Sequence, residues 1–250
     1  MKKWEKNYFE IKDEKEKSSL YFYFKFLKSK IFKKLNGDIV EAGVFKGSSL
    51  ISTAILLRKR KLLKNKLIWA YDTFRGFPKT NYNDNEKIFD KLFKEKKITN
   101  NHYKNILQLR KYNKVFKSSK LTPRNISTSE NFNNTSFKLV KKKLEIFKLL
   151  KYIKLVEGDF EKTMKIKGNI PKKISVGLID CDLYGGYKTS LEFFWPRLEK
   201  KGKLFLDEYY SLKFPGPRIA VNEFIIKNKN AKLIKEGLSL DFERWSIQKS

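Results

Sequence analysis

Four acidic residues follow two apolar runs in the second half of the chain. Asp180 and Asp182 stand at the end of the first run, ISVGLID, and Asp207 and Glu208 stand at the end of the second, KLFLDE. Gathering carboxylates in a buried place costs free energy unless their charge is balanced. Their oxygen atoms suit a hard divalent cation such as Mg²⁺ or Mn²⁺, which also lowers the pKa of a hydroxyl bound to it. The acids therefore predict a cation site, unless they cap the helices that follow, as Asp182 could.

Nearer the N-terminus, an apolar run that begins at residue 38 leads into a glycine-containing turn, in VEAGVFKGSS. Gly43 and Gly47 let the backbone turn tightly, and Ser48 and Ser49 open a helix whose N-terminal N–H groups favour an anionic group. The spacing differs from G-x-G-x-x-G, which disfavours a dinucleotide dehydrogenase. Glu41 adds an acid on the strand, so the motif fits a ligand with charges of both signs, such as S-adenosylmethionine. A turn without a ligand is the alternative.

Acidic residues also follow the next two apolar runs. Asp72 ends KLIWAY, where a carboxylate can accept hydrogen bonds from both ribose hydroxyls of a nucleoside cofactor. Asp159 ends YIKLVEG, where it can accept from an adenine amino group. Each acid alone could be a helix cap or a surface residue. The order Glu41, Asp72, Asp159 at three successive strand ends favours a nucleoside cofactor.

These residues need a scaffold that brings strand ends together. Short apolar runs alternate with amphipathic segments, which predicts βαβ units and a mostly parallel, doubly wound α/β sheet with an antiparallel C-terminal edge. Ligands of such sheets bind beyond the carboxyl ends of the strands. We expect strands at 38–44, 66–71, 152–157, 174–179, 203–206, 231–235 and 244–248, and helices at 48–63, from 137 onward, at 182–199 and at 218–228.

Two further segments belong to what we expect to be a single domain over residues 1–250. Apolar residues at spacings of three and four predict one helix over 14–35, within an N-terminal helical segment 1–36. We expect this helix to pack on the domain; because it is rich in Lys and aromatic residues, contact with an anionic membrane surface is the alternative. The polar stretch 79–135 predicts a lid-like insert. His102 in this insert is the only histidine, and we expect it to be a solvated surface residue.

Composition limits the classes of partner and compartment. The formal net charge is +30 at pH 7, which fits a polyanionic partner. However, the excess is mostly Lys spread along the chain beside abundant Asn, Ile and Phe, and a preference for A- and T-rich codons is the simpler explanation. The single cysteine excludes an internal disulfide, and no window of 18 residues is apolar and uncharged. We expect a cytoplasmic protein that does not bind nucleic acid.

Five blocks of the chain resemble the macrocin O-methyltransferase family. They are GDIVEAGVFKGSS, YDTFRGFP, VEGDFEKTM, LIDCDLYGGYKTSLEFFWPRLEKKGKLFLDEYY and PGPRIAVNEF. They cover roughly residues 37–224 apart from the insert. Members of this family use S-adenosylmethionine and a divalent cation to methylate sugar hydroxyls, often on glycosylated natural products. The resemblance implies a Rossmann-like methyltransferase fold, S-adenosylmethionine with Mg²⁺ as cofactors, and a small-molecule or glycan hydroxyl as the acceptor.

The resemblance also implies the residues of the site. Those that bind the cofactor are Glu41, Gly43, Gly47, Ser48, Ser49, Asp72, Asp159 and Asp180. The residues from Glu41 to Ser49 hold the methionine end, Asp72 the ribose and Asp159 the adenine side. The metal ligands are Asp180, Asp207 and Glu208, and the general base is Asp182.

The chain departs from the family pattern in two places. The family usually has Asp-Asp where this chain has Asp207-Glu208, so the longer Glu208 side chain shifts the ion or contacts it indirectly. The insert is longer than usual, so the identity of the acceptor is the property that carries over least from the family to this chain. The resemblance implies in-line methyl transfer from the sulfonium to an oxygen held by the ion. Related enzymes often assemble, which leaves a homo-oligomer open.

Two other functions remain as alternatives. An RNA methyltransferase shares the cofactor fold and would use the +30 charge, although an acid cluster on the acceptor side repels phosphate. A basic scaffold or membrane-surface protein could keep the fold without catalysis, although the intact run of strand-end acids argues against this.

Overall fold

A seven-stranded sheet forms the centre of the computed structural model, which describes residues 2–12, 18–63, 65–117 and 119–250. The strand order is β3-β2-β1-β4-β5-β7-β6. β1 to β5 are parallel to one another, and β7 pairs antiparallel with β5 and β6. The predicted mostly parallel sheet with an antiparallel C-terminal edge is confirmed. The strands are β1 (Asp38–Ala42), β2 (Ile68–Asp72), β3 (Ile153–Glu157), β4 (Ile174–Ile179), β5 (Leu198–Leu206), β6 (Ala231–Ser239) and β7 (Phe242–Lys249).

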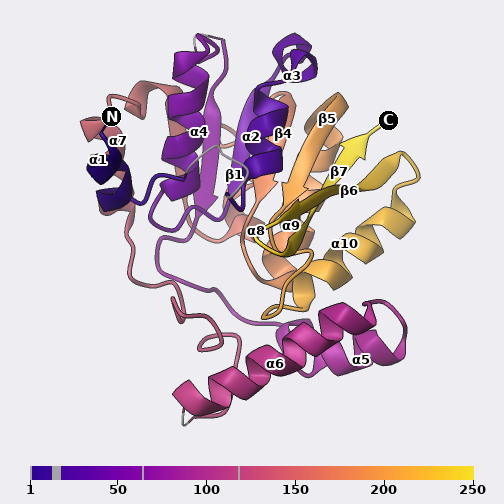
Figure 1. The fold of residues 1–250 in the computed structure, drawn as a ribbon. Helices are drawn as coiled ribbons and strands as arrows, with labels where there is room; N and C mark the ends of the chain where they lie inside the picture. The colour runs from indigo at the N-terminus through magenta and orange to yellow at the C-terminus, as the bar shows by residue number, and fades with distance from the viewer. Residues whose placement is uncertain (1, 13–17, 64, 118) are drawn as a thin grey trace.

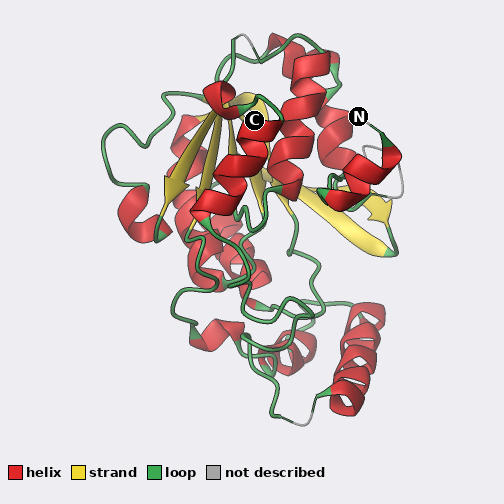
Figure 2. Cartoon of the chain, turned by 90° about the vertical axis from the view of Figure 1, so that its left-hand side faces the viewer, coloured by secondary structure: helices red, strands yellow, loops and turns green. Residues whose placement is uncertain are grey.

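Helices cover both faces of the sheet (Figures 1 and 2). The α-helices are α1 (Lys3–Tyr8), α2 (Tyr21–Leu27), α3 (Lys30–Lys34), α4 (Ser48–Lys59), α5 (Ile88–Lys94), α6 (Asn100–Phe116), α7 (Phe137–Ile146), α8 (Phe160–Thr163), α9 (Tyr184–Phe194) and α10 (Gly216–Lys227). Three short 3₁₀ turns are η1 (Tyr82–Asp84), η2 (Leu150–Tyr152) and η3 (Trp195–Arg197).

Alternate residues of each central strand face two separate hydrophobic cores. Ile39 of β1 packs with side chains of α2, α4 and α7, whereas its neighbour Val40 packs with those of α9 and α10. Successive strand residues point to opposite faces, so a strand that is covered on both faces is buried along its whole length. This is why β4 is buried at all six of its residues.

The N-terminal segment differs from the prediction of one helix over 14–35. Residues 13–17 lie outside the described part of the chain. The described residues of 14–35 form two short helices, α2 and α3. Ser29 separates them, because its side-chain oxygen caps α3 by accepting a hydrogen bond from Phe32 N at 3.1 Å. The apolar side chains of α2, such as Phe24 and Leu27, are buried in the domain core. α2 thus packs on the domain, as the sequence favoured.

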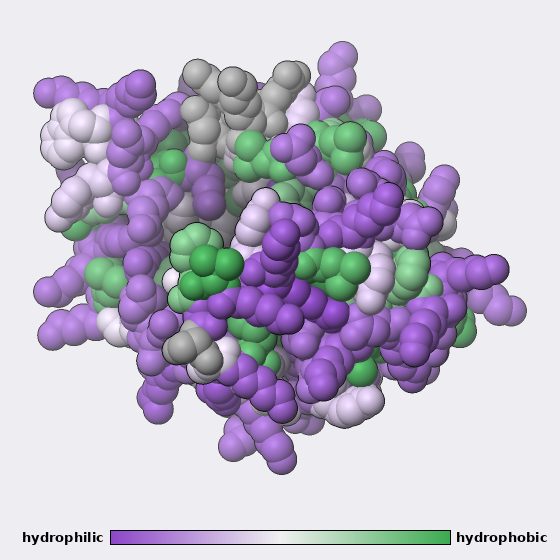
Figure 3. Space-filling model, turned by 60° about the horizontal axis from the view of Figure 1, so that its bottom comes forward, coloured by the Kyte–Doolittle hydropathy of each residue, from purple (hydrophilic) through white to green (hydrophobic). Residues whose placement is uncertain are grey.

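The surface carries little continuous apolar area on the face shown in Figure 3. Hydrophilic side chains dominate this face, and the hydrophobic ones form small separate patches. Within the described part of the chain, no helix combines the length and the apolarity needed to cross a bilayer.

The α9–β5 junction also differs from the predicted helix over 182–199. The helix starts at Tyr184 and ends at Phe194, where Pro196 enters a 3₁₀ turn. Proline lacks the N–H that would continue the helix, so the chain turns there. β5 then begins at Leu198, earlier than expected.

The insert folds into helices instead of remaining an irregular segment. α5 and α6 lie below the sheet in Figure 1. They share a small core that includes Phe89, Leu92 and Ile106, and this core packs against Leu212 and Ile219 of the main body. Only a narrow stripe of α6 is buried, so its mostly polar sequence did not predict a helix.

Candidate active site

A cleft lies at the carboxyl ends of the parallel strands. Its volume is about 910 Å³. Sheet pairing continues one residue past the strands, since Asp180 N donates to Ala42 O at 2.8 Å and Asp207 N to Ile179 O at 3.1 Å. These bonds place the residues after each strand along one edge. The predicted site residues in the cleft wall are Gly43, Ser48, Ser49, Asp72, Asp159, Asp180, Asp182, Asp207 and Glu208.

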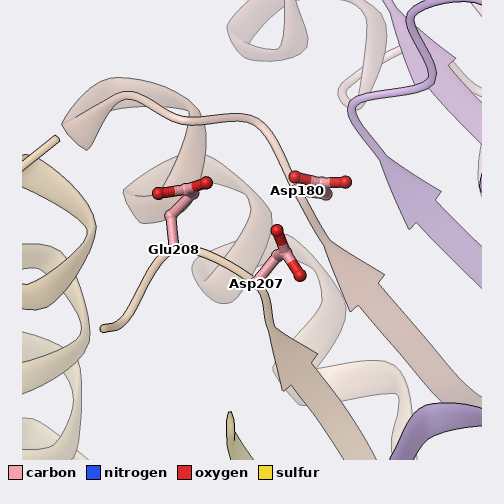
Figure 4. A group of neighbouring side chains, drawn as sticks. All are labelled: Asp180, Asp207 and Glu208. Carbon is pink, nitrogen blue, oxygen red and sulfur yellow. The ribbon is translucent and has the colours of Figure 1, made fainter. Parts of the chain in front are cut away.

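Asp180, Asp207 and Glu208 form the acid cluster (Figure 4). One carboxylate oxygen of each lies within 4.8 Å of those of the other two. The cause is the sheet register: Ile179 of β4 lies opposite Leu206 of β5, so the residues that follow them meet. The structure thus brings together the three residues expected to hold a cation.

The electrostatics of the acid cluster favour a bound cation. Burial, followed by the charges of Asp207 and Asp182, raises the pKa of Asp180 well above its ordinary range. Burial and the charge of Asp207 raise the pKa of Glu208 to about 7. One counter-charge comes from Arg244 of β7, whose Nη1 lies 3.4 Å from Asp207 Oδ1. The charges of Lys213 and Arg244 lower the pKa of Glu208, but they do not offset burial and the charge of Asp207.

Asp182 lines the cleft beside the cluster, in a strained turn. Its φ is +59°, and Leu183 N donates to Cys181 O at 2.6 Å across it. A three-residue turn with positive φ at its centre is rare for a side chain other than glycine. Asp182 does not cap α9, which begins at Tyr184 without a side-chain cap. Asp182 lines the cleft, and burial, followed by the charge of Glu208, raises the pKa of its carboxyl group.

The two glycines of the first turn have different surroundings. Gly43 has a φ of +90°, and a methyl group there would overlap the carbonyl oxygen of Asp180. Gly47 has a φ of +81° and is buried, and a methyl group there would lie 3.2 Å from Val140 of α7. Gly43 therefore lines the cleft, whereas Gly47 shapes the entry to α4. Ser48 lines the cleft and its hydroxyl donates to the carbonyl oxygen of Glu10.

Glu41 lies behind the cleft wall. It is fully buried, and the hydroxyl of Ser49 donates to its Oε1 at 2.6 Å. Its Oε2 has no hydrogen-bond partner among the described residues. Burial raises the pKa of Glu41 to about 8, although the bond from Ser49 opposes this. Glu41 contacts the cleft wall through Ser49, which does line the cleft.

Asp72 and Asp159 lie at the strand ends where they were expected. Asp72 Oδ2 accepts from Val44 N at 2.6 Å and from Phe45 N at 2.8 Å, so it ties the glycine turn to β2. Asp159 is exposed and caps α8 by accepting from Glu161 N at 2.9 Å. Both residues line the cleft and retain lone pairs for a ligand.

The prediction that His102 is a solvated surface residue is wrong. Its side chain is 1% exposed and stacks on Tyr210, with ring centroids 3.9 Å apart. Nε2 lies 2.8 Å from Ser211 O, and it carries the proton because a carbonyl oxygen only accepts. The physical reason is that α6 docks on the segment after β5, a contact between residues far apart in the sequence.

Three residues near the acids were not found from the sequence. Arg244 contacts Asp207, and Lys213 lines the cleft. Nothing separates these two from the other residues among 57 Lys and Arg. Asp84 is 1% exposed and accepts from Tyr184 N, two residues after Asp182. The only signal for Asp84 was an acid inside a polar insert.

Solved structures with this architecture include methyltransferases. NovP, an O-methyltransferase, superposes with a TM-score of 0.61 at 19% sequence identity, covering 88% of this chain and 74% of NovP. CalS11, the calicheamicin methyltransferase, superposes with a TM-score of 0.57 at 21% identity, covering 87% of this chain and 74% of CalS11. At these identities the comparison establishes the Rossmann-like fold.

Sequence comparison reaches the family level. The mycinamicin III 3''-O-methyltransferase of Micromonospora griseorubida is 24% identical over 189 residues, which are 75% of this chain and 60% of that enzyme. The family model described as Macrocin-O-methyltransferase (TylF) matches residues 24–112 and 112–240, from α2 to the end of β6. The chain therefore belongs to the macrocin O-methyltransferase family.

Proposed function

We propose that the protein is an S-adenosylmethionine-dependent O-methyltransferase that methylates a sugar hydroxyl of a small molecule or glycan. The observation that carries the proposal is the placement of the acid cluster in the same cleft as Asp72 and Asp159. One end of the cleft has acceptors for a nucleoside, and the other has carboxylates for a cation. Membership of the family supports the reaction class.

The cofactor half of the cleft is formed by the ends of β1, β2 and β3. Asp72 is placed to accept from the ribose hydroxyls, and Asp159 from the adenine amino group. Ser49 and the turn at Gly43 lie at the start of α4, where backbone N–H groups favour a carboxylate. Asp180 stands between the two halves, since it lies against Gly43 and also belongs to the acid cluster.

The acid cluster fits a divalent cation by its donor set. Three carboxylates converge within 4.8 Å, and Mg²⁺ and Mn²⁺ prefer oxygen ligands. Burial and the charge of Asp207 raise the pKa of Glu208 although Lys213 and Arg244 lower it, so a bound cation would stabilise the ionised carboxylate further. When bound, S-adenosylmethionine supplies the methyl group and the cation lowers the pKa of the acceptor hydroxyl.

Asp182 is placed to take the proton from that hydroxyl. It lines the cleft next to the acid cluster, and its carboxylate does not cap α9. A carboxylate is a weak base towards an ordinary alcohol, so it acts only on a hydroxyl that is already acidified. Alignment of acceptor and cofactor supplies much of the remaining acceleration, for which roughly 7–11 kcal/mol is available in well-oriented systems.

A binding experiment on the purified chain tests this proposal. S-adenosylmethionine binding is measured by calorimetry, and Mn²⁺ binding by electron paramagnetic resonance. Tritiated methyl transfer is then screened against simple sugar glycosides and against RNA. We expect saturable binding of both ligands and transfer to a sugar. Transfer to RNA with a steep salt dependence would instead support the nucleic-acid alternative.

A pair of matched variants assigns the cation site. Asp207→Asn removes one ligand charge from the acid cluster and is expected to weaken Mn²⁺ binding by at least about tenfold. Asp241→Asn makes the same substitution at an exposed acid on the β6–β7 turn, outside the cleft, and should leave Mn²⁺ binding unchanged. Equal Mn²⁺ affinity in the two variants contradicts the assignment.

A further inference from the structure

We propose that Asp84 of the insert is a positioning residue that fixes the turn carrying Asp182. Its side chain is 1% exposed, and both of its oxygens accept backbone N–H groups. Oδ1 accepts from Tyr184 N at 2.6 Å, and Oδ2 accepts from Asn81 N at 2.7 Å. The inference rests on the proposed function, in which Asp182 is the general base.

The turn at Asp182 needs support from outside. A side chain at φ +59° is strained, and such conformations persist only where the surrounding structure over-determines them. On one side the chain is fixed by the sheet, where Asp180 N donates to Ala42 O. On the other side, Tyr184 N is the second backbone N–H after Asp182, and it is held by Asp84. Asp84 therefore fixes the free end of the turn.

The surroundings of Asp84 are built to receive a carboxylate. Tyr184 is the first residue of α9, so its N–H has no partner within the helix and favours a negative charge. Gly216 opens α10 on the other side, and a methyl group there would overlap Asp84 Oδ1. The starts of two helices and the insert thus meet at one buried carboxylate.

A second bond ties the insert to the other acidic segment. His102 Nε2 donates to Ser211 O, three residues after Glu208. The insert is therefore anchored on both sides of the acid cluster, at Tyr184 and at Ser211. Residues next to Asp84, such as Asn81, line the cleft. The wall that these residues form is therefore anchored beside the turn that carries Asp182.

Hydrogen–deuterium exchange with mass spectrometry tests the role of Asp84 without any ligand. In Asp84→Asn the side-chain amide has one oxygen and one NH₂ group. The NH₂ group faces either Tyr184 N–H or Asn81 N–H and cannot accept its hydrogen bond. We expect exchange of residues 180–187 to accelerate about tenfold or more, because a bond to a charged acceptor is lost. Asp90→Asn is the matched control: Asp90 contacts Arg110 and Tyr103 inside the insert, away from this turn. It should leave exchange of residues 180–187 unchanged.

Turnover separates positioning from a general structural role. With the simple sugar glycoside that accepts methyl groups in the transfer screen, Asp84→Asn is expected to lower kcat about 10²-fold, with KM for the acceptor and the Kd for S-adenosylmethionine unchanged. Asp84→Ser keeps one acceptor oxygen and serves if Asp84→Asn does not fold. Equal exchange of residues 180–187 in the Asp84 and Asp90 variants overturns the inference. Absence of methyl transfer by the wild type would count against the proposed function, whereas the exchange result decides the role of Asp84 separately.

Discussion

Gly43 packs directly against the backbone of Asp180, so the first turn of the cofactor half touches the first residue of the acid cluster. A methyl group at residue 43 would overlap the carbonyl oxygen of Asp180. The two halves of the cleft are therefore joined by a contact that leaves no space for a side chain.

Gly43→Ala should destabilise the protein and weaken S-adenosylmethionine binding. The added methyl group meets backbone atoms at a φ of +90°, so we expect a loss of about 2–4 kcal/mol in the free energy of unfolding. Urea denaturation measures this. Gly168→Ala is the control, because Gly168 has a φ of +103° but no atom within 4 Å of the added methyl group. A similar loss in both variants would mean that backbone strain alone, without the contact to Asp180, sets the cost.

Asp182→Asn should remove turnover while leaving both ligands bound. The amide cannot take a proton, and loss of a general base costs about 10²–10⁴-fold in kcat. Asp159→Asn provides the comparison, because asparagine caps α8 as well as aspartate does and only the cofactor contact changes. We expect that variant to raise the Kd for S-adenosylmethionine and to keep kcat at saturation. Wild-type kcat in Asp182→Asn would remove the assignment of the base.

His102 should make the fold less stable as the pH falls. Burial lowers its pKa to about 4 in the folded chain, from about 6.5 in the unfolded chain. Between these values the unfolded state binds a proton that the folded state does not. The free energy of unfolding therefore decreases by about 3 kcal/mol as the pH falls from 6.5 to 4. Denaturant titrations of wild type and His102→Gln measure it; the same pH slope in both would show that other groups cause the loss.

Glu41 should have the opposite pH dependence. Burial raises its pKa to about 8, against 4.5 for the unfolded chain, so the folded state keeps a proton that the unfolded state loses. Stability therefore falls as the pH rises from 4.5 to 8. We expect Glu41→Gln to be more stable than wild type at pH 9 and similar to it at pH 5. Glu145→Gln, at an exposed position of α7, should show no such difference. Parallel curves for wild type and Glu41→Gln would mean that Glu41 ionises normally.

The sequence was informative about the strands because their burial leaves a simple signal. β1, β2 and β4 are mostly apolar and are buried on both faces, and an acid or glycine marks the end of each. It was less informative about helices whose apolar stripe is narrow. α6 has only three buried residues among seventeen, so its polar sequence predicted a lid instead of a docked helix.

From the sequence alone we could predict the order of the strands, the acids at the strand ends and the family, because all of these depend on residues near one another in the chain. The tertiary structure decided which acids meet, because Asp180 and Asp207 are brought together by the pairing of β4 with β5. It also decided the surroundings of Asp84 and His102, whose partners lie 100 and 109 residues away. A polar residue becomes an anchor only when a distant segment buries it and supplies its hydrogen bonds, and no local pattern records that.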